Sequence, residues 1–261
     1  MVCMRNGVAL ALALGLALGA FAVAAQEPAR PPAQPGPASG APPEAAKPAE
    51  TVETARPAGS GVASYQLPTV GKPRRRIGGG RRGPGDPLPE LWALVPEHVA
   101  LTASEKPTLF WYLSDASPGY VIFELTLVHE SSIEPVVDVR LSQPQAKGLQ
   151  RVDLGAHGVA LAPGQEYQWS LALVVDPEQR SRDVVATGWI ERVPAPDGLD
   201  SRLSAAGPGG AAAVYADAGL WYDALAAIWR LSELRPGDPE PQQQLDALLT
   251  QVGLPSLPLA R

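Results

Sequence analysis

The 261-residue chain is poor in cysteine and in aromatic residues, and each shortage excludes a class of protein. Its single cysteine excludes a disulfide scaffold and any zinc or iron–sulfur site built from several thiolates of one chain. Aromatic residues make up 6% of the chain, and all its tryptophans and tyrosines follow residue 64. A hydrophobic core is therefore expected only in that part. Proline is abundant, with 29 residues where average usage predicts about 13, but no Gly-x-y period indicates collagen.

Catalytic and metal-binding motifs are also scarce. The three histidines, His98, His129 and His157, lie far apart and form no HExxH or other clustered ligand pattern, so we expect neither a metal nor a cofactor. His129 and Ser131 would share a strand face, but a serine nucleophile also needs an orienting group and an oxyanion hole, and the sequence identifies neither. Paired carboxylates remain open as a hydrolase alternative, because acidic residues are abundant.

Residues 1–25 have the pattern of a secretory signal peptide. Arg5 precedes an apolar run from Gly7 to Ala25, and Ala22-Val23-Ala24 supplies the small residues of a cleavage site. The run is close to membrane-spanning length, so an uncleaved anchor is the alternative. The sequence predicts an extracytoplasmic protein, periplasmic or secreted, that contacts a membrane only if this segment stays uncleaved.

Residues 26–73 are predicted to form a disordered Pro/Ala-rich tether. Residues 26–50 contain eight prolines and no aromatic or β-branched residue, so they cannot bury enough apolar surface to offset their ordering entropy. A partly polyproline segment of this kind would hold a folded domain away from its point of attachment.

A basic cluster follows the tether, and it is the sequence's candidate binding site. Its six members are Lys72, Arg74, Arg75, Arg76, Arg81 and Arg82. The chain carries a formal charge of −6, and without these six residues it would carry −12. We expect the cluster either to pair with the acidic remainder of the chain or to contact an anionic envelope surface. Nucleic-acid binding is not expected, because the chain has a secretory signal and no aromatic residues interleave with the basic ones.

Residues 74–195 are predicted to form an antiparallel β-sandwich of the immunoglobulin/fibronectin-like kind. Short apolar runs broken by Pro, Gly and Asp every eight to twelve residues favour this fold over alternating helices and strands. The candidate strands are Leu91–Val95, His98–Leu101, Thr108–Leu113, Gly119–His129, Pro135–Leu141, Leu149–Leu154, Glu166–Val175 and Asp183–Val193. Pro163-Gly164 precedes Tyr167 as in the tyrosine corner of such sandwiches, where the hydroxyl bonds back to the backbone.

Residues 196–261 are predicted to form a small helical subdomain. Helices are expected at Ala211–Ala218, Trp221–Leu234 and about Pro239–Gln251, because the apolar period changes to 3.6 and Gly or Pro ends each run. The spacing of Ala224, Ile228 and Pro236 resembles the second half of a tetratricopeptide repeat, although only one copy is present. We expect this unit to cap the sandwich; a peptide-binding groove is the alternative.

Several short segments, taken in order, resemble a bacterial secreted family, domain-of-unknown-function family 928. They are Arg75–Arg82, Leu94-Val95-Pro96, Lys106–Tyr112, Gly164–Trp169 and Gly188–Arg192. The resemblance covers about residues 74–250 and implies an extracytoplasmic protein without bringing a known activity or catalytic residue.

The sequence thus predicts a non-enzymatic accessory protein that binds an envelope polymer or another secreted protein. A carbohydrate-binding module is an alternative, because Trp92, Trp111, Trp169 and Trp189 fall on strands where exposed rings could stack on sugars. An unrecognised hydrolase that uses carboxylates is the second alternative. The sequence predicts neither the ligand nor the oligomeric state.

Overall fold

The computed structural model describes residues 64–68, 88–132, 134–141 and 146–259. The chain divides into two units, residues 1–53 and residues 54–261, and every described residue lies in the second. The predicted signal peptide lies outside the described residues, as does most of the predicted tether. Within the described ranges, no helix is both long enough and apolar enough to cross a membrane.

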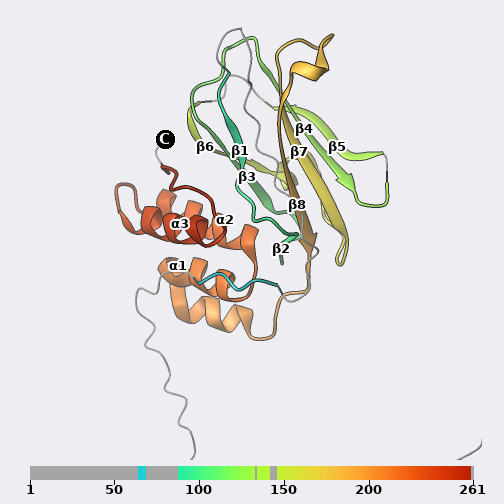
Figure 1. The fold of residues 1–261 in the computed structure, drawn as a ribbon. Coiled ribbons are helices and arrows are strands. Elements are labelled where there is room, and N and C mark those ends of the chain that lie inside the picture. The colour runs from blue at the N-terminus through green and yellow to red at the C-terminus, as the bar shows by residue number, and fades with distance from the viewer. Residues whose placement is uncertain (1–63, 69–87, 133, 142–145, 260–261) are drawn as a thin grey trace, which may run out of the picture. The chain divides into compact units, whose positions relative to one another are not determined.

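The described strands form two sheets (Figure 1). The three-stranded sheet has the order β1 (Leu91–Ala93), β3 (Thr108–Leu113), β6 (Gly148–Asp153), and the five-stranded sheet has the order β2 (Ala100–Thr102), β8 (Val184–Arg192), β7 (Glu166–Val174), β4 (Ile122–His129), β5 (Pro135–Leu141). All eight predicted strands are present, with ends that agree to within three residues. The prediction of a mainly β fold is confirmed.

Strand β2 departs from the predicted antiparallel arrangement. It pairs with β8 in parallel, with Ala100 opposite Ile190, whereas every other strand pair in the two sheets is antiparallel. The reason is the link over residues 94–99, which forms no hairpin turn and carries the chain from β1 in one sheet to β2 in the other.

Alternating side chains of both sheets fill one hydrophobic core, as the period of two predicted. On β3 these are Leu109, Trp111 and Leu113; on β4 they are Phe123, Leu125 and Leu127; on β7 they are Tyr167, Trp169, Leu171 and Leu173. The predicted hydrogen bond of the tyrosine corner is present, because the backbone N–H of Ala162 donates to the Tyr167 hydroxyl at 3.2 Å.

The helices follow the strands as α1 (Leu199–Asp217), α2 (Trp221–Leu234) and α3 (Glu240–Gln251). Helix α2 has the predicted bounds, whereas α1 begins twelve residues before the predicted Ala211. Residues 207–210 directly precede the predicted start of this helix at Ala211. They are instead a kink inside α1, because Gly207 takes φ 62° and ψ −174° and Pro208 then opens a second helical run. Proline is tolerated in the first turn of a helix, where its missing N–H has no intrahelical partner.

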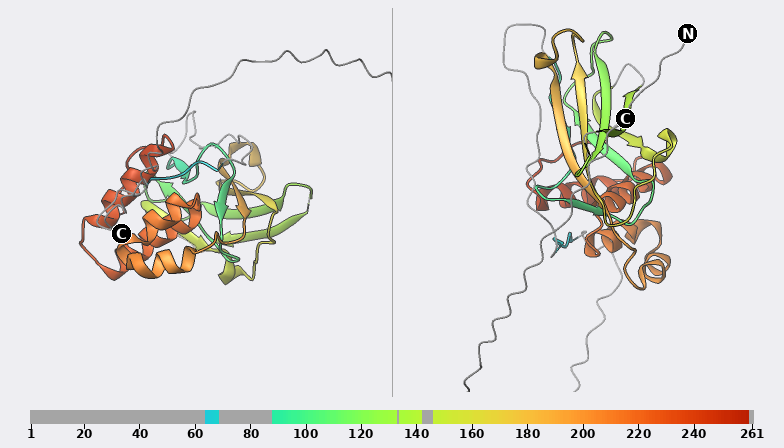
Figure 2. Two further views of the ribbon diagram at one scale, coloured as in Figure 1. Left: turned by 90° about the horizontal axis from the view of Figure 1, so that it is seen from below. Right: turned by 90° about the vertical axis from the view of Figure 1, so that its right-hand side faces the viewer.

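Three consecutive residues at the start of α2 attach the helices to three different parts of the sandwich. The indole Nε1–H of Trp221 donates to the Leu94 carbonyl at 2.8 Å. The Tyr222 hydroxyl accepts from the Trp169 indole at 2.8 Å and donates to the Trp189 carbonyl at 3.0 Å. The Asp223 carboxylate accepts from the backbone N–H of Ala103 at 2.9 Å. Figures 1 and 2 show the helices grouped against one end of the strands, where these bonds lie.

The segment 64–68 also belongs to this core, so the predicted tether boundary at residue 73 is wrong for these residues. Tyr65 is only 7% exposed, its ring meets Trp221 edge-on at 5.0 Å between centroids, and its hydroxyl lies 2.9 Å from His98 Nε2. The backbone N–H of Gln66 donates to the Ala216 carbonyl of α1 at 3.0 Å. One buried aromatic ring is enough to fix a short segment that the surrounding Pro/Ala-rich composition predicts to be disordered.

Candidate functional site

The basic cluster predicted as an anionic-surface site lies outside the described residues. Its members are Lys72, Arg74, Arg75, Arg76, Arg81 and Arg82. The cluster stays a prediction, and the candidate site must be built from other residues.

The described part of the chain contains no group of three or more His, Cys, Asp or Glu side chains that could hold a metal ion. The three histidines are separate: His98 contacts Tyr65, His129 lies at the end of β4, and His157 is exposed. Burial lowers the pKa of His98, as expected for an imidazole that becomes harder to protonate away from water.

His129 and Ser131 form the contact expected of a nucleophile and its base. The Ser131 hydroxyl lies 2.8 Å from His129 Nδ1, and His129 Nε2 lies against the Gln165 side-chain oxygen. Because Nδ1 accepts from the Ser131 backbone N–H, Nε2 is the nitrogen that donates to the Gln165 oxygen. However, the Ser131 N–H donates to His129 Nδ1 and the Ser132 N–H donates to the His129 carbonyl. Neither N–H is free to stabilise an oxyanion, so the pair has the geometry of a hairpin turn.

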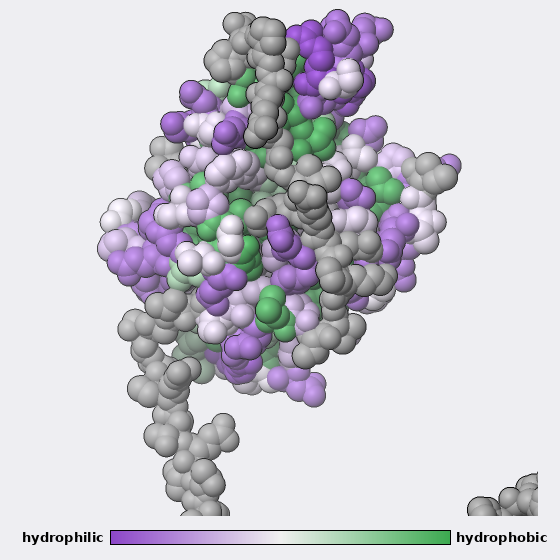
Figure 3. All heavy atoms as spheres, viewed as in Figure 1, coloured by the Kyte–Doolittle hydropathy of each residue, from purple (hydrophilic) through white to green (hydrophobic). Residues whose placement is uncertain are grey.

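The four strand tryptophans divide into two pairs. Trp111 and Trp169 are 1% and 0% exposed and cannot stack on a sugar. Trp92 and Trp189 are half-buried. On the face shown in Figure 3, the hydrophobic residues among the described ones form small patches separated by hydrophilic residues.

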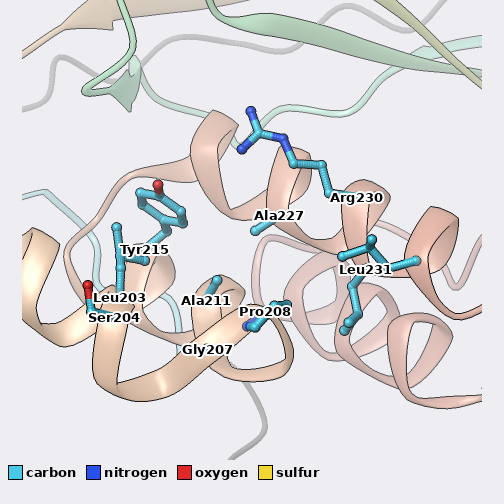
Figure 4. Close-up of a pocket in the computed structure, with 10 residues that line it drawn as sticks. Leu203, Ser204, Gly207, Pro208, Ala211, Tyr215, Ala227, Arg230 and Leu231 are labelled. Carbon is cyan, nitrogen blue, oxygen red and sulfur yellow. The ribbon is translucent and has the colours of Figure 1, made fainter.

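A groove between α1 and α2 has a volume of about 450 Å³. This volume is within the range of small-molecule and peptide sites. Figure 4 shows the lining residues, which are Leu203, Ser204, Gly207, Pro208, Ala211 and Tyr215 from α1 and Ala227, Arg230, Leu231 and Leu234 from α2.

The kink in α1 shapes this groove. Gly207 takes a backbone conformation that is essentially restricted to glycine, so the helix breaks there and its two halves run in different directions. Leu203 and Ser204 come from the first half, and Ala211 and Tyr215 from the second. Leu234 at the end of α2 is 65% exposed, so the groove has an apolar side chain available at its rim.

Arg230 is the charged residue of the groove. In Figure 4, Arg230 and Tyr215 rise from different helices with their polar ends pointing the same way, and Gly207 and Pro208 lie on the opposite side. Among the described residues Arg230 has no hydrogen-bond or ion-pair partner, whereas Arg202 pairs with Asp217 and Arg235 with Glu240. Its guanidinium is therefore available to an anion from outside this part of the chain.

The charges near this rim act on one another. Burial raises the pKa of Tyr215, the negative charge of Asp223 adds to the rise, and the positive charge of Arg230 opposes it. The phenol of Tyr215 therefore stays protonated and can donate a hydrogen bond. Tyr215 and Arg230 together present an O–H donor and a cation beside apolar side chains.

A smaller cavity of about 160 Å³ lies on the other flank of α2, against β3 and β6, and Arg151 and Glu233 in its lining pair with each other. The Arg151 guanidinium lies 5.3 Å from the centroid of the Trp229 ring and 3.6 Å from the Glu233 carboxylate. Trp229 Nε1–H donates to the same carboxylate at 2.9 Å. This cavity has polar walls but no cation left for a ligand, apart from the shared Arg230.

Asp223 should make the stability of the protein depend on pH. Burial raises the pKa of this carboxyl, although hydrogen bonds from Ala103 and Thr102 oppose the rise. The unfolded chain then loses this proton first as pH rises, so the folded state binds more protons and the free energy of unfolding falls. We expect the decline to begin near pH 4, the ordinary value for Asp, and to continue through the raised pKa.

The substitution Asp223→Asn should remove this contribution. Urea denaturation from pH 3.5 to 7.5 should show wild type losing stability relative to Asp223→Asn as pH rises. Asp115→Asn, at an exposed loop position, removes the same charge and serves as the control. A constant difference between wild type and Asp223→Asn over this range would contradict the effect.

Sequence reasoning missed Arg230 as a site residue. The available signal was its isolation, since it is the only basic residue of α2 and directly follows the apolar run from Ala224 to Trp229. The sequence predicts a helical unit that caps the sandwich, and a peptide-binding groove is only the alternative to that role. The sequence contains Gly207-Pro208 but does not show that this pair opens a concave surface.

Comparison with known proteins adds a family and one structural likeness. The family model described as Domain of Unknown Function (DUF928) matches residues 77–260. No curated protein matches the chain. Among solved structures, the fn3 domain of the human collagen alpha-1(XX) chain is similar over 45% of this chain and 93% of that domain's chain, with 13% identity and a TM-score of 0.24.

Proposed function

Since this chain belongs to the Domain of Unknown Function (DUF928) family, whose description assigns no activity, we propose from its own surface that it is a non-enzymatic accessory protein that binds another secreted protein. The observation that carries the proposal is the groove between α1 and α2, which is concave and mostly apolar and is bordered by Arg230, a residue without an ion-pair partner in the described part of the chain. Sites that bind peptide segments combine apolar walls with a few polar groups that orient the ligand.

The proposed location is extracytoplasmic, periplasmic or secreted after cleavage at Ala22-Val23-Ala24. The support for it is the signal-peptide pattern of residues 1–25 and the Pro/Ala-rich composition of the segment that follows. Such a segment would let the folded unit reach a partner at a distance from its attachment point. The basic cluster would then hold an anionic envelope polymer as a second contact.

We also propose a finer description of the two parts of the fold. The sandwich is immunoglobulin/fibronectin-like, and the supporting features are the two sheets and the corner formed by Tyr167 and Ala162. The helices form a single tetratricopeptide-like unit, supported by the spacing of Ala224, Ile228 and Pro236 and by the antiparallel packing expected of such a helix pair. A groove on the exposed side of a helix pair suits an extended peptide segment.

The proposal is tested by capturing partners from extracytoplasmic fractions with the full chain and with a variant whose groove is filled. Ser204→Trp places an indole in the groove from an exposed position, so it should leave the fold intact. Ala205→Trp adds the same ring at the next, exposed position outside the groove and is the control.

We expect a specific set of secreted proteins to be retained by wild type and by Ala205→Trp, and to be lost at least about tenfold with Ser204→Trp, as expected if the pocket anchors the contact. Equal retention by the two tryptophan variants would overturn the groove as the binding site. No protein retained by wild type above the level of a blank matrix would overturn the proposed function.

A further inference from the structure

We infer that the groove binds an extended peptide segment in which an Asp or Glu side chain is flanked by small or branched apolar residues, and that Arg230 and Tyr215 hold the carboxylate. This inference rests on the proposed function and specifies the chemistry of the partner segment. It follows from three features of the groove, which are its charge, its apolar walls and its exposed rim.

The charge of the groove selects an anion. Arg230 is exposed, lines the groove, and has no hydrogen-bond or ion-pair partner among the described residues. The Asp223 carboxylate interacts with the Arg230 charge, but among the described residues it forms no ion pair with it, and it accepts a hydrogen bond from the Ala103 N–H at the start of α2. An unpaired guanidinium beside an apolar surface favours a carboxylate or phosphate, with which it forms charge-assisted hydrogen bonds.

Tyr215 favours a carboxylate as the anion. Its phenol is protonated at neutral pH, as an ordinary tyrosine is, and it presents one O–H donor in the same groove as Arg230. A planar carboxylate has two oxygens, one for the guanidinium and one for the phenol. A phosphate would need a further donor for its third oxygen. Apart from Tyr215, the lining contains one hydroxyl, that of Ser204 on the first half of α1.

The apolar walls select the neighbouring residues of the segment. Leu203, Pro208, Ala211, Leu231 and Leu234 offer side chains without hydrogen-bonding groups, so the ligand must place apolar side chains there. The volume of about 450 Å³ is large enough for a few such side chains. Small residues on α1 and α2 at Ala211 and Ala227 let a peptide backbone approach both helices closely.

The rim of the groove is exposed, so a segment can lie across it. The break at Gly207 separates the two halves of α1, and Pro208 and Leu234, both exposed, lie at this rim. An internal acidic side chain fits this shape because the chain can continue on both sides of the carboxylate.

The test uses a defined set of hexapeptides, acetylated and amidated, with Glu at the third position and Ala, Leu, Val or Pro at the others. The matched set has Gln at the third position and is otherwise identical. Both sets are passed over the immobilised full chain, and retention is measured by mass spectrometry. The variants are Arg230→Gln and Ser204→Trp. The control is Arg202→Gln, which removes an arginine of α1 that already pairs with Asp217 of the same helix.

Wild type should retain the Glu set about tenfold more than the Gln set, the factor expected from one charge-assisted hydrogen bond. Arg230→Gln should equalise the two sets, whereas Arg202→Gln should leave the preference unchanged. Tyr215→Phe should reduce the preference less than Arg230→Gln does. Circular dichroism and thermal unfolding establish that each variant is folded.

The outcomes separate this inference from the proposed function. If both sets bind wild type equally and Ser204→Trp abolishes both, the groove binds peptides without reading a carboxylate, and only the inference is overturned. If neither set is retained, the inference is overturned as well, while the capture of secreted proteins still decides the proposed function. A preference for the Glu set that survives Arg230→Gln would also overturn the inference.

Discussion

Replacing Trp221 with alanine should lower the free energy of unfolding by about 3–5 kcal/mol, the range for removing a buried tryptophan. This side chain is fully buried, meets the Tyr65 ring at 5.0 Å and donates to the Leu94 carbonyl at 2.8 Å. Its loss would leave a large cavity and an unpaired buried carbonyl at the junction of helices and sandwich. Urea denaturation followed by far-ultraviolet circular dichroism measures the change.

Two further variants separate the contributions at this junction. Trp221→Phe keeps an aromatic ring but removes the indole N–H, so it should cost less than Trp221→Ala. Trp92→Ala removes a half-buried tryptophan of the three-stranded sheet and should cost about 1 kcal/mol, a typical value for a point substitution. If Trp221→Ala lowered the free energy of unfolding by less than Trp92→Ala does, the role assigned to α2 would be contradicted.

Gly188→Ala should destabilise the protein by about 3 kcal/mol, the upper part of the range for overpacking a core. A Cβ at position 188 would lie 2.7 Å from the indole Cε2 and Nε1 of Trp169. Trp169 cannot move aside easily, because it is fully buried and its Nε1–H donates to Tyr222 at 2.8 Å. Gly188 lies directly opposite Trp169 in the pairing of β7 with β8, so the contact is built into the register.

Gly119→Ala is the matched control, since a Cβ there meets no atom within 4 Å. It should change the free energy of unfolding by less than about 0.5 kcal/mol, as surface substitutions usually do. The double variant Gly188→Ala/Trp169→Phe should be less destabilised than the sum of its two single substitutions, because the smaller ring relieves the clash. Strict additivity in this cycle, or a neutral Gly188→Ala, would contradict the packing described.

The strands could be predicted from sequence because one local signal was enough. Alternation on Leu109, Trp111 and Leu113 determines a buried face wherever the chain forms a strand, and the buried residues agree with it. Phe110 could not be assigned in the same way. It points to the opposite face of β3 and is nevertheless 1% exposed, because Trp229 of α2 packs on it at 6.1 Å between ring centroids. That contact joins residues more than a hundred positions apart.

The same limit applies to Tyr65 and to the start of α2. Composition predicts disorder around Tyr65, and only Trp221 and His98 explain why this residue is buried. The helical period predicts the bounds of α2 but not that Trp221, Tyr222 and Asp223 each bond to a different part of the sandwich. These partners are set by tertiary packing, which no local pattern encodes.

The groove shows the corresponding limit for the candidate site. Gly207-Pro208 indicates only that a regular helix is interrupted there, and an interruption gives no direction to the segments on either side of it. Arg230 gains its significance from the apolar residues around it and from the absence of an ion-pair partner among the described residues, both of which are properties of the folded unit. The predicted basic cluster at residues 72–82 remains a separate prediction.

Occupation of the groove can be measured directly by protection of a single thiol. Replacing Cys3 with serine leaves a chain without cysteine, into which Ser204→Cys or Ala205→Cys is then introduced. Both thiols should react at similar rates with a maleimide, because both positions are exposed. Adding the Glu hexapeptide set should slow the reaction of the cysteine at 204 and leave that at 205 unchanged. If the peptides left the reaction rates of both cysteines unchanged, the groove would be contradicted as the binding site.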